Sequence, residues 1–209
     1  PNSAEAHHNL SLALRRCGKH KDALISSATA AELAPDNHLV LFSLGISYEK
    51  LGQSNEAIKT YMESIKLRPA YVPALNNLGR LLDLEGQTFE SIKLLEKALE
   101  IIPDSKDILV NLANAYLSIG KPEKTIAVLK QILANPKETK SNLVATIYNT
   151  LGVSAYIMGD KRIAIGNLEK AIDYNPSFAD AHENLAQVLL SIGAYKRAWH
   201  EYEWRKKKV

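Results

Sequence analysis

Residues 38–71 read HLVLFSLGISYEKLGQSNEAIKTYMESIKLRPAY, and this 34-residue stretch sets the pattern of the whole chain. Leu44 and Tyr48 lie four residues apart, so they share one face of a predicted first helix. Gly52 suits the end of that helix, because a left-handed turn is costly for any residue with a Cβ. Pro69 closes a predicted second helix, since proline lacks the amide donor. The stretch therefore predicts two helices joined by a tight turn.

The same pattern recurs along the chain. Glycines follow one another at intervals of 34 residues, with one interval of 39, at Gly18, Gly52, Gly86, Gly120, Gly159 and Gly193. A leucine stands eight residues before each glycine, at Leu10, Leu44, Leu78, Leu112, Leu151 and Leu185. A period of this length indicates stacked helical hairpins, which bury their apolar stripes only against their neighbours. The fold class predicted is an all-α solenoid without a compact globular core.

Small residues at two further positions predict how each hairpin closes. The residue after each leucine is Ser11, Gly45, Gly79, Ala113, Gly152 or Ala186. Five residues after each glycine stands Ala23, Ala57, Ser91, Thr125, Ala164 or Ala198. A large side chain at either position would hold the two helices apart. We therefore expect the paired helices to approach closely at these points.

These positions resemble the tetratricopeptide repeat family. The family's pattern of 34 residues matches Leu41, Leu44, Gly45, Tyr48, Ala57, Tyr61 and Pro69. The resemblance implies a right-handed superhelix whose first helices line a concave groove. It divides residues 1–209, as a single array, into units at 4–37, 38–71, 72–105, 106–139, 145–178 and 179–209. Residues 136–142 are then an insertion, expected to lengthen a helix or a loop.

The two ends of the array carry expectations of their own. Pro1 has the phase of a closing proline, so we expect the sequence to be part of a longer array. The last predicted helix concentrates Trp199, Tyr202 and Trp204, and such rings call for a covering partner. Self-association through this helix is one hypothesis. The stretch 202–205 also resembles the junction at which bacterial repeat proteins continue into a glycosyltransferase-type domain, and this gives a second hypothesis.

The composition is that of a water-soluble globular class. The chain has 46% hydrophobic and 23% charged residues and a net charge of +3. It lacks the long uncharged run of a membrane span, and its slight basic surplus gives little reason to expect nucleic-acid binding. Cys17 is the single cysteine, and no spacing resembles a metal site. The first residues show no targeting signal. The working assignment is a cytoplasmic protein without metal or cofactor.

A column of polar residues is predicted along the groove. The sixth position of each unit is, in order, Asn9, Ser43, Asn77, Asn111, Thr150 and Asn184. An asparagine amide both donates and accepts hydrogen bonds, so it can pair with a peptide backbone without reading side chains. The column resembles the asparagine ladder with which O-linked N-acetylglucosamine transferases hold protein substrates. The alternative is that these amides only bridge neighbouring hairpins.

Other groove positions implied by the resemblance mix polar and apolar character. The predicted peptide-binding residues are Asn9, Phe42, Ile46, Asn77, Arg80, Asn111, Asn114, Tyr156, Asn184 and Gln187. Tyr156 lies with Val153 and Ile157 in an apolar patch, which is either a binding surface or packing between hairpins. The clamp that holds acidic C-termini in some family members is disfavoured, because His8 and Phe42 stand where its lysines would be.

No constellation of reactive residues is present in the sequence. Catalysis would need a nucleophile with its base, paired carboxylates or a phosphate-binding glycine loop. His7 and His182 stand where the family places a large ring, so packing explains them better than metal ligation. The predicted function is a non-catalytic scaffold that binds a protein or peptide. The alternatives are the substrate-recognition arm of a glycosyltransferase-type enzyme and a self-assembly module.

Overall fold

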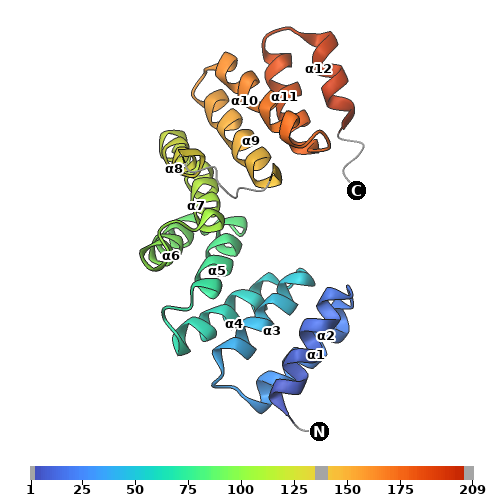
Figure 1. Cartoon of the computed structure of the whole chain (residues 1–209), viewed down its shortest axis with the longest axis vertical. Helices are drawn as coiled ribbons and strands as arrows, with labels where there is room; N and C mark the ends of the chain where they lie inside the picture. Colours follow the sequence, from blue (N-terminus) through green and yellow to red (C-terminus); the bar gives the residue numbers. More distant parts are fainter. Residues whose placement is uncertain (1–2, 135–140, 205–209) are drawn as a thin grey trace. The chain divides into compact units, whose positions relative to one another are not determined.

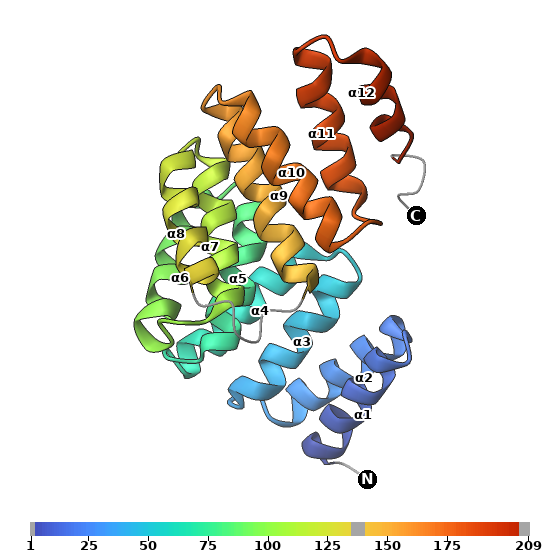
Figure 2. The same cartoon turned by 45° about the horizontal axis from the view of Figure 1, so that its top comes forward.

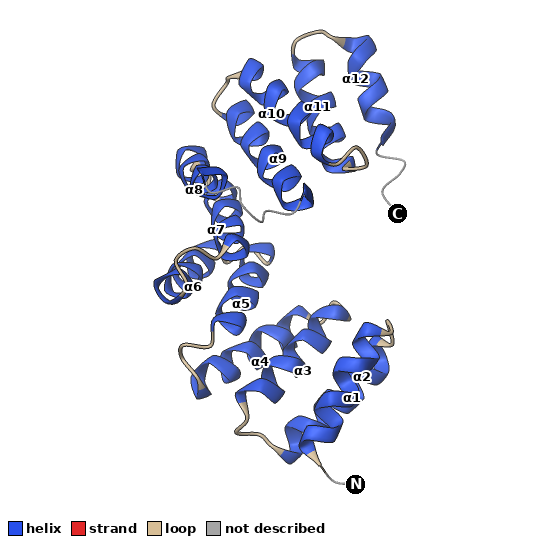
Figure 3. Cartoon of the chain, viewed as in Figure 1, coloured by secondary structure: helices blue, strands red, loops and turns tan. Residues whose placement is uncertain are grey.

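The computed structural model describes residues 3–134 and 141–204, and these residues form helices and loops without a strand (Figure 3). The helices come in pairs along the chain (Figure 1). Their bounds are α1 (Ala4–Arg16), α2 (His20–Leu33), α3 (His38–Lys50), α4 (Ser54–Leu67), α5 (Val72–Leu84), α6 (Thr88–Ile101), α7 (Lys106–Ser118), α8 (Pro122–Ala134), α9 (Ser141–Ile157), α10 (Lys161–Tyr174), α11 (Ala179–Ser191) and α12 (Tyr195–Tyr202).

Two compact units divide the chain, residues 1–111 and residues 112–209. In the first unit, α1 packs on α2, α3 on α4 and α5 on α6, and each hairpin contacts the next through α2 with α3 and α4 with α5 (Figure 2). In the second unit, α9 packs on α10 and α11 on α12, while α8 contacts α9 and α10 contacts α11. The predicted all-α solenoid of helical hairpins is confirmed. The division into six units and the superhelix stay predictions.

Every recurring glycine adopts the left-handed conformation expected after a first helix. The φ angles lie between 67° and 86°, at Gly18, Gly52, Gly86, Gly120, Gly159 and Gly193. At Gly52, for example, the amides of Gly52 and Gln53 donate to the carbonyl oxygens of Glu49 and Tyr48. These bonds satisfy carbonyl groups that the helix end leaves open.

The predicted close approach of paired helices is also confirmed. A Cβ built on Gly45 would lie 2.5 Å from the ring of Tyr61, and one on Gly79 would lie 2.8 Å from Leu95 Cγ. Gly152 is equally crowded, at 2.6 Å from Leu168 Cγ. The small residues of the second helices are all fully buried: Ala23, Ala57, Ser91, Thr125, Ala164 and Ala198. Glycine at these three positions leaves room for a large side chain from the facing helix.

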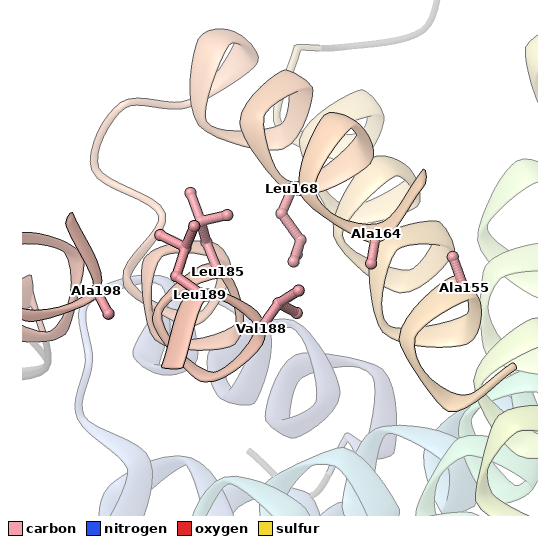
Figure 4. Close-up of a cluster of buried hydrophobic side chains, with 7 residues drawn as sticks. All are labelled: Ala155, Ala164, Leu168, Leu185, Val188, Leu189 and Ala198. Atoms are coloured by element: carbon pink, nitrogen blue, oxygen red, sulfur yellow. The ribbon is translucent and has the colours of Figure 1, made fainter. Parts of the chain in front are cut away.

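The leucines that stand eight residues before each turn glycine are mostly buried, as expected for a solenoid. Five of them are buried, namely Leu44, Leu78, Leu112, Leu151 and Leu185. Leu10 is 48% exposed, because in the described residues no hairpin precedes α1 to cover it. Figure 4 shows an apolar cluster of the second unit, to which Leu185 and Leu189 of α11 and Leu168 of α10 belong. Full burial of each such leucine contributes about 1.5–3 kcal/mol.

Two departures from the regular repeat have a structural counterpart. The helix that follows the insertion, α9, has 17 residues where α7 has 13, so part of the insertion lengthens a helix. Residues 135–140 lie outside the described residues. At the other end, Trp204 stacks on His182 of α11 with ring centroids 4.2 Å apart. One of the two tryptophans is therefore packed within the last hairpin. Trp199 stays 59% exposed.

Candidate functional site

The first helices of neighbouring hairpins touch each other, α1 with α3 in the first unit and α9 with α11 in the second. The predicted groove residues all lie on first helices, so we call their surface in each unit the first-helix face. It is defined by Asn9, Phe42, Ile46, Asn77, Arg80 and Asn111 in the first unit, and by Asn114, Tyr156, Asn184 and Gln187 in the second.

An asparagine pair joins two first helices in the first unit. Asn111 Nδ2 on α7 donates to Asn76 Oδ1 on α5 over 2.8 Å. Both side chains are half-buried. Each amide has two N–H donors and an oxygen with two lone pairs, and the bond between them uses only one donor and one acceptor. The pair can therefore still donate to and accept from a third group.

The same pair occurs in the second unit. Asn184 Nδ2 on α11 donates to Asn149 Oδ1 on α9 over 2.9 Å, and both residues are again half-buried. In both units the partners are 35 residues apart, one more than the repeat length. The asparagines thus bridge neighbouring hairpins at these two positions, Asn76–Asn111 and Asn149–Asn184. In both pairs some amide N–H and oxygen groups remain without a hydrogen bond.

The predicted polar column is not continuous. Ser43 and Thr150 are 2% and 6% exposed. Ser43 Oγ lies 3.3 Å from Ser11 Oγ, and Thr150 donates to the carbonyl oxygen of Thr146. The short side chains of Ser43 and Thr150 are buried and already make hydrogen bonds within the protein, so they interrupt the column. Asn9, by contrast, is exposed.

A polar network ties the second hairpin to the third. Tyr61 is fully buried, and its hydroxyl donates to Glu49 Oε2 over 3.0 Å. Arg80 forms an ion pair with the same carboxylate, and Asn77 Nδ2 donates to the Tyr61 hydroxyl. Burial raises the pKa of Tyr61 above its ordinary value; the hydrogen bond from Asn77 opposes this rise, and the nearby Glu49 carboxylate adds to it. The predicted site residue Arg80 is therefore already neutralised within the protein.

The apolar members of the predicted site are partly structural. Phe42 packs with Ile46 against the buried cluster around Tyr61, and its ring centroid lies 5.2 Å from that of Tyr71. Tyr156 packs against the cluster drawn in Figure 4. The remaining three predicted residues of the second unit are half-buried or exposed: Asn114, Asn184 and Gln187.

Sequence reasoning missed the partners of the asparagines and the acid beside Arg80. Asn76 and Asn149 occupy the fifth position of their units, and an asparagine follows at the sixth position of the next unit in both cases. That offset of 35 residues is visible in the sequence, and the structure shows that it brings the two side chains together. Nothing in the sequence shows that Glu49 binds Tyr61 and Arg80, because its role depends on side chains of two neighbouring hairpins.

An apolar cleft of about 510 Å³ also lies in the first unit, between α4, α5 and α6. Leu78 and Leu82 line it from α5, and Met62 of α4 stands beside it with 57% of its surface exposed. Lys66, Glu90 and Lys93 place charges of both signs around it. The sequence reading assigned no role to this surface.

Within residues 3–134 and 141–204, no group of three or more histidine, cysteine or acidic side chains is placed to hold a metal ion. His182 is buried, with Nδ1 2.5 Å from Glu201 Oε2 and Nε2 3.0 Å from the carbonyl oxygen of Pro176. Its ring therefore serves contacts between α11, α12 and the preceding loop. Of the helices described, none is long and apolar enough to cross a membrane.

Paired helices and left-handed turn glycines define a helical repeat protein. Three family models, each described as tetratricopeptide repeat, match residues 39–71, 82–142 and 149–203. The chain belongs to the tetratricopeptide repeat family. Human tetratricopeptide repeat protein 21B is 38% identical over 68 residues, which is 32% of this chain and 5% of that protein.

Solved structures share the fold at low sequence identity. A tetratricopeptide repeat protein from Parabacteroides merdae is 20% identical, with a TM-score of 0.82 over 99% of this chain and 79% of its own. PilW, a type IV pilus biogenesis factor, is 18% identical, with a TM-score of 0.84 over 98% and 93% of the two chains. A chain of the Cut9–Hcn1 hetero-tetramer of APC/C is 17% identical, with a TM-score of 0.81 over 96% of this chain and 40% of its own. The predicted link to a glycosyltransferase-type domain has no support in these similarities.

Proposed function

We propose that the protein is a non-catalytic scaffold that binds an extended segment of another protein on its first-helix face. Tetratricopeptide repeats are generally protein-interaction scaffolds. The asparagine pairs Asn76–Asn111 and Asn149–Asn184 are the observation that carries the proposal. In each pair an amide N–H and an amide oxygen remain available, and these are the complements of a peptide C=O and N–H.

The chemistry of an amide pair favours recognition of backbone over side chain. An extended segment offers a donor and an acceptor at every residue except proline. Neutral amides can satisfy both without a charge on the ligand, so sequence specificity has to come from neighbouring groups. Phe42 and Ile46 in the first unit, and Tyr156 in the second, offer half-buried apolar surface for that purpose.

The test begins with random peptides displayed on phage and selected on the immobilised protein. Binding of the selected peptides is then compared between wild type, the double variant N76A/N111A and the double variant N149A/N184A. We expect at least one double variant to lose affinity by about two- to tenfold per lost hydrogen bond. Asn55→Ala is the matched control, because Asn55 is an exposed asparagine on the second helix α4.

Backbone recognition has its own readout in the ligand. Methylation of a peptide nitrogen that pairs with an asparagine amide should weaken binding, whereas alanine substitution of the side chain of that same peptide residue should not. Circular dichroism of each variant shows whether the helices are intact. The proposal fails if both double variants bind every selected peptide as wild type does.

A further inference from the structure

The apolar cleft between α4, α5 and α6 lies apart from the first-helix face, none of whose residues lines it. Helix α5 packs against both α4 and α6, and these two second helices form the walls. The apolar lining residues are Ile58, Met62, Ile65, Leu78, Leu82 and Leu94. Its volume of about 510 Å³ falls within the range of about 300–1,000 Å³ that is usual for sites of small organic ligands. The cleft is therefore large enough to hold a small molecule.

One departure from the repeat pattern lies in this cleft. Leu82 stands where the neighbouring units have an aromatic ring, because Tyr48 precedes it by 34 residues and Tyr116 follows it by 34. In the next hairpin Lys124 covers the ring of Tyr116, with Nζ 4.9 Å from the ring centroid. The residues equivalent to that pair are Leu82 and Glu90, and both line the cleft. The shorter leucine leaves space that a tyrosine would occupy.

The fold leaves apolar surface open in this cleft. Met62 is 57% exposed, and Ile65 and Leu94 are only partly buried on the core beneath them. At the positions equivalent to Met62, the neighbouring hairpins have Ala28 and Glu96 instead. Burying such surface contributes about 25 cal/mol per Å², and an unbranched methionine side chain adapts its shape to an occupant. An apolar ligand is therefore favoured over a polar one.

The stripe of lining residues on α4 sets the length of that ligand. Ile58, Met62 and Ile65 are four and three residues apart, so they share one face of the helix. From Ile58 to Lys66 the helix rises about 12 Å, at about 1.5 Å per residue. An extended hydrocarbon chain advances roughly 1.3 Å for each carbon–carbon bond, so a chain of about ten carbons matches the stripe.

Charged groups at the margin favour an anionic head group on the ligand. Lys66 of α4 and Lys93 of α6 line the cleft together with a single acid, Glu90. All three are exposed, so their stems cover apolar surface while their charges stay in water. Among the described residues, none of the three takes part in an ion pair. Two positive charges against one negative charge leave the margin attractive to an anion.

We propose that the cleft binds a medium-chain fatty acid of about ten carbons, whose chain lies on α5 between α4 and α6. Its carboxylate lies at the open margin near Lys66 and Lys93. The free acid is the occupant, since the cleft offers the length of one such chain. This site is independent of the proposed function, because the asparagine pairs lie on first helices and line no part of the cleft.

The experiment uses three probes that share one chain and differ in the charge of the head group: decanoate, 1-decanol and decylammonium. Each is titrated below its micelle concentration into the whole 209-residue chain, whose methionine methyl groups carry 13C. The chain has two methionines, Met62 and Met158, and both are exposed. Met158 lies in the second unit, so its methyl signal is an internal control. Met62→Leu assigns the two signals.

We expect a saturable shift of the Met62 methyl signal with decanoate and none at Met158. Decanoate should bind about two- to fivefold more tightly than decanol at low salt, and decylammonium more weakly than both, because exposed charges contribute little. Added salt should reduce these differences and leave the binding of the chain itself.

Two variants separate the cleft from unspecific apolar contact. Leu82→Tyr places the residue of the neighbouring units in the cleft and should weaken decanoate binding about tenfold or more. Leu84→Tyr is the matched control, because Leu84 belongs to the same helix α5 but is 69% exposed and does not line the cleft. Circular dichroism shows whether each variant keeps its helices.

The double variant K66Q/K93Q tests the head group without a change in the core. Decanoate and decanol should then bind within about twofold of each other, while the chain still binds. The N76A/N111A variant should bind decanoate as wild type does, since neither asparagine lines the cleft. Failure of the fatty-acid site and failure of the scaffold are therefore distinguishable.

Four results would overturn the fatty-acid site. They are a Met62 shift that does not saturate, unchanged decanoate affinity in a folded Leu82→Tyr variant, preference for decylammonium, and equal binding of decanoate and decanol by wild type at low salt. A Met62 signal that responds only to peptides selected on the protein would assign the cleft to a protein partner and would also overturn it.

Discussion

Alanine at Gly152 should destabilise the hairpin formed by α9 and α10, whereas alanine at Gly166 should stabilise it. The two substitutions add the same methyl group to two helices of one hairpin. A Cβ on Gly152 would lie 2.6 Å from Leu168 Cγ and 3.2 Å from the carbonyl oxygen of Ala164. A Cβ on Gly166 would meet no atom within 4 Å. The comparison therefore isolates crowding from helix propensity.

The magnitude follows from two opposing effects. Overpacking a core costs about 1–3 kcal/mol, while replacing glycine by alanine inside a helix contributes about 0.5–1 kcal/mol. Leu168 is fully buried, so its side chain cannot move away into solvent, and the carbonyl oxygen of Ala164 has to move as well. We expect a net loss of about 1–2 kcal/mol for Gly152→Ala and a gain of about 0.5–1 kcal/mol for Gly166→Ala.

Native-state hydrogen exchange is the suitable assay, because long repeat arrays need not unfold in one step. Amides of α9 and α10 should exchange about 5–30 times faster in Gly152→Ala, and more slowly in Gly166→Ala. Wild-type protection in Gly152→Ala would show that the facing helix can shift at little cost. Faster exchange in Gly166→Ala would refute the space assigned to that position.

Three further predictions address the first unit. Gly86→Ala should cost about 1–2 kcal/mol in urea unfolding, because φ is +79° there, and Gly86→Asn should cost less, since asparagine tolerates this conformation. Tyr61→Phe removes the hydroxyl that donates to Glu49 and should lower stability by about 0.5–1.5 kcal/mol; an unchanged urea midpoint would contradict the network. His8 has a pKa below its ordinary 6.5 in the fold, so the unfolded chain takes up a proton first as the pH falls, and stability should be lost from about pH 6.5 downwards. His8→Gln should make the urea midpoint less sensitive to pH over that range, and an identical pH dependence would exclude His8 as a contributor.

Much of the hairpin geometry could be predicted from residue spacing. Gly52 and its counterparts were predicted to mark turns, because the left-handed conformation at a helix end is costly for any residue with a Cβ. Gly45 had to mark a close approach for a different reason, since a larger side chain at this position would hold the paired helices apart. Such features are local, or they depend on the neighbouring helix of the same hairpin, so the sequence pattern contains both partners within one unit.

The candidate site was only partly predictable. The sequence placed Asn111 and Asn184 at equivalent positions, but a period alone does not show how adjacent first helices are rotated. That rotation decides that Asn111 meets Asn76 and that Ser43 is buried against Ser11. It also places Tyr61, Arg80 and Asn77 around one carboxylate.

By itself, the sequence determined the repeat, the helical hairpins and the family, because these depend on periodicity and on the sterics of glycine, proline and small residues. Only the tertiary structure decided which polar groups remain free for a ligand. Arg15 and Arg80 are the same residue type on the same face, and a single acid, Glu49, lies within reach of one of them. An ion pair forms only when its nitrogen and oxygen atoms lie within about 4 Å, so its formation depends on side-chain positions that a repeat pattern does not specify.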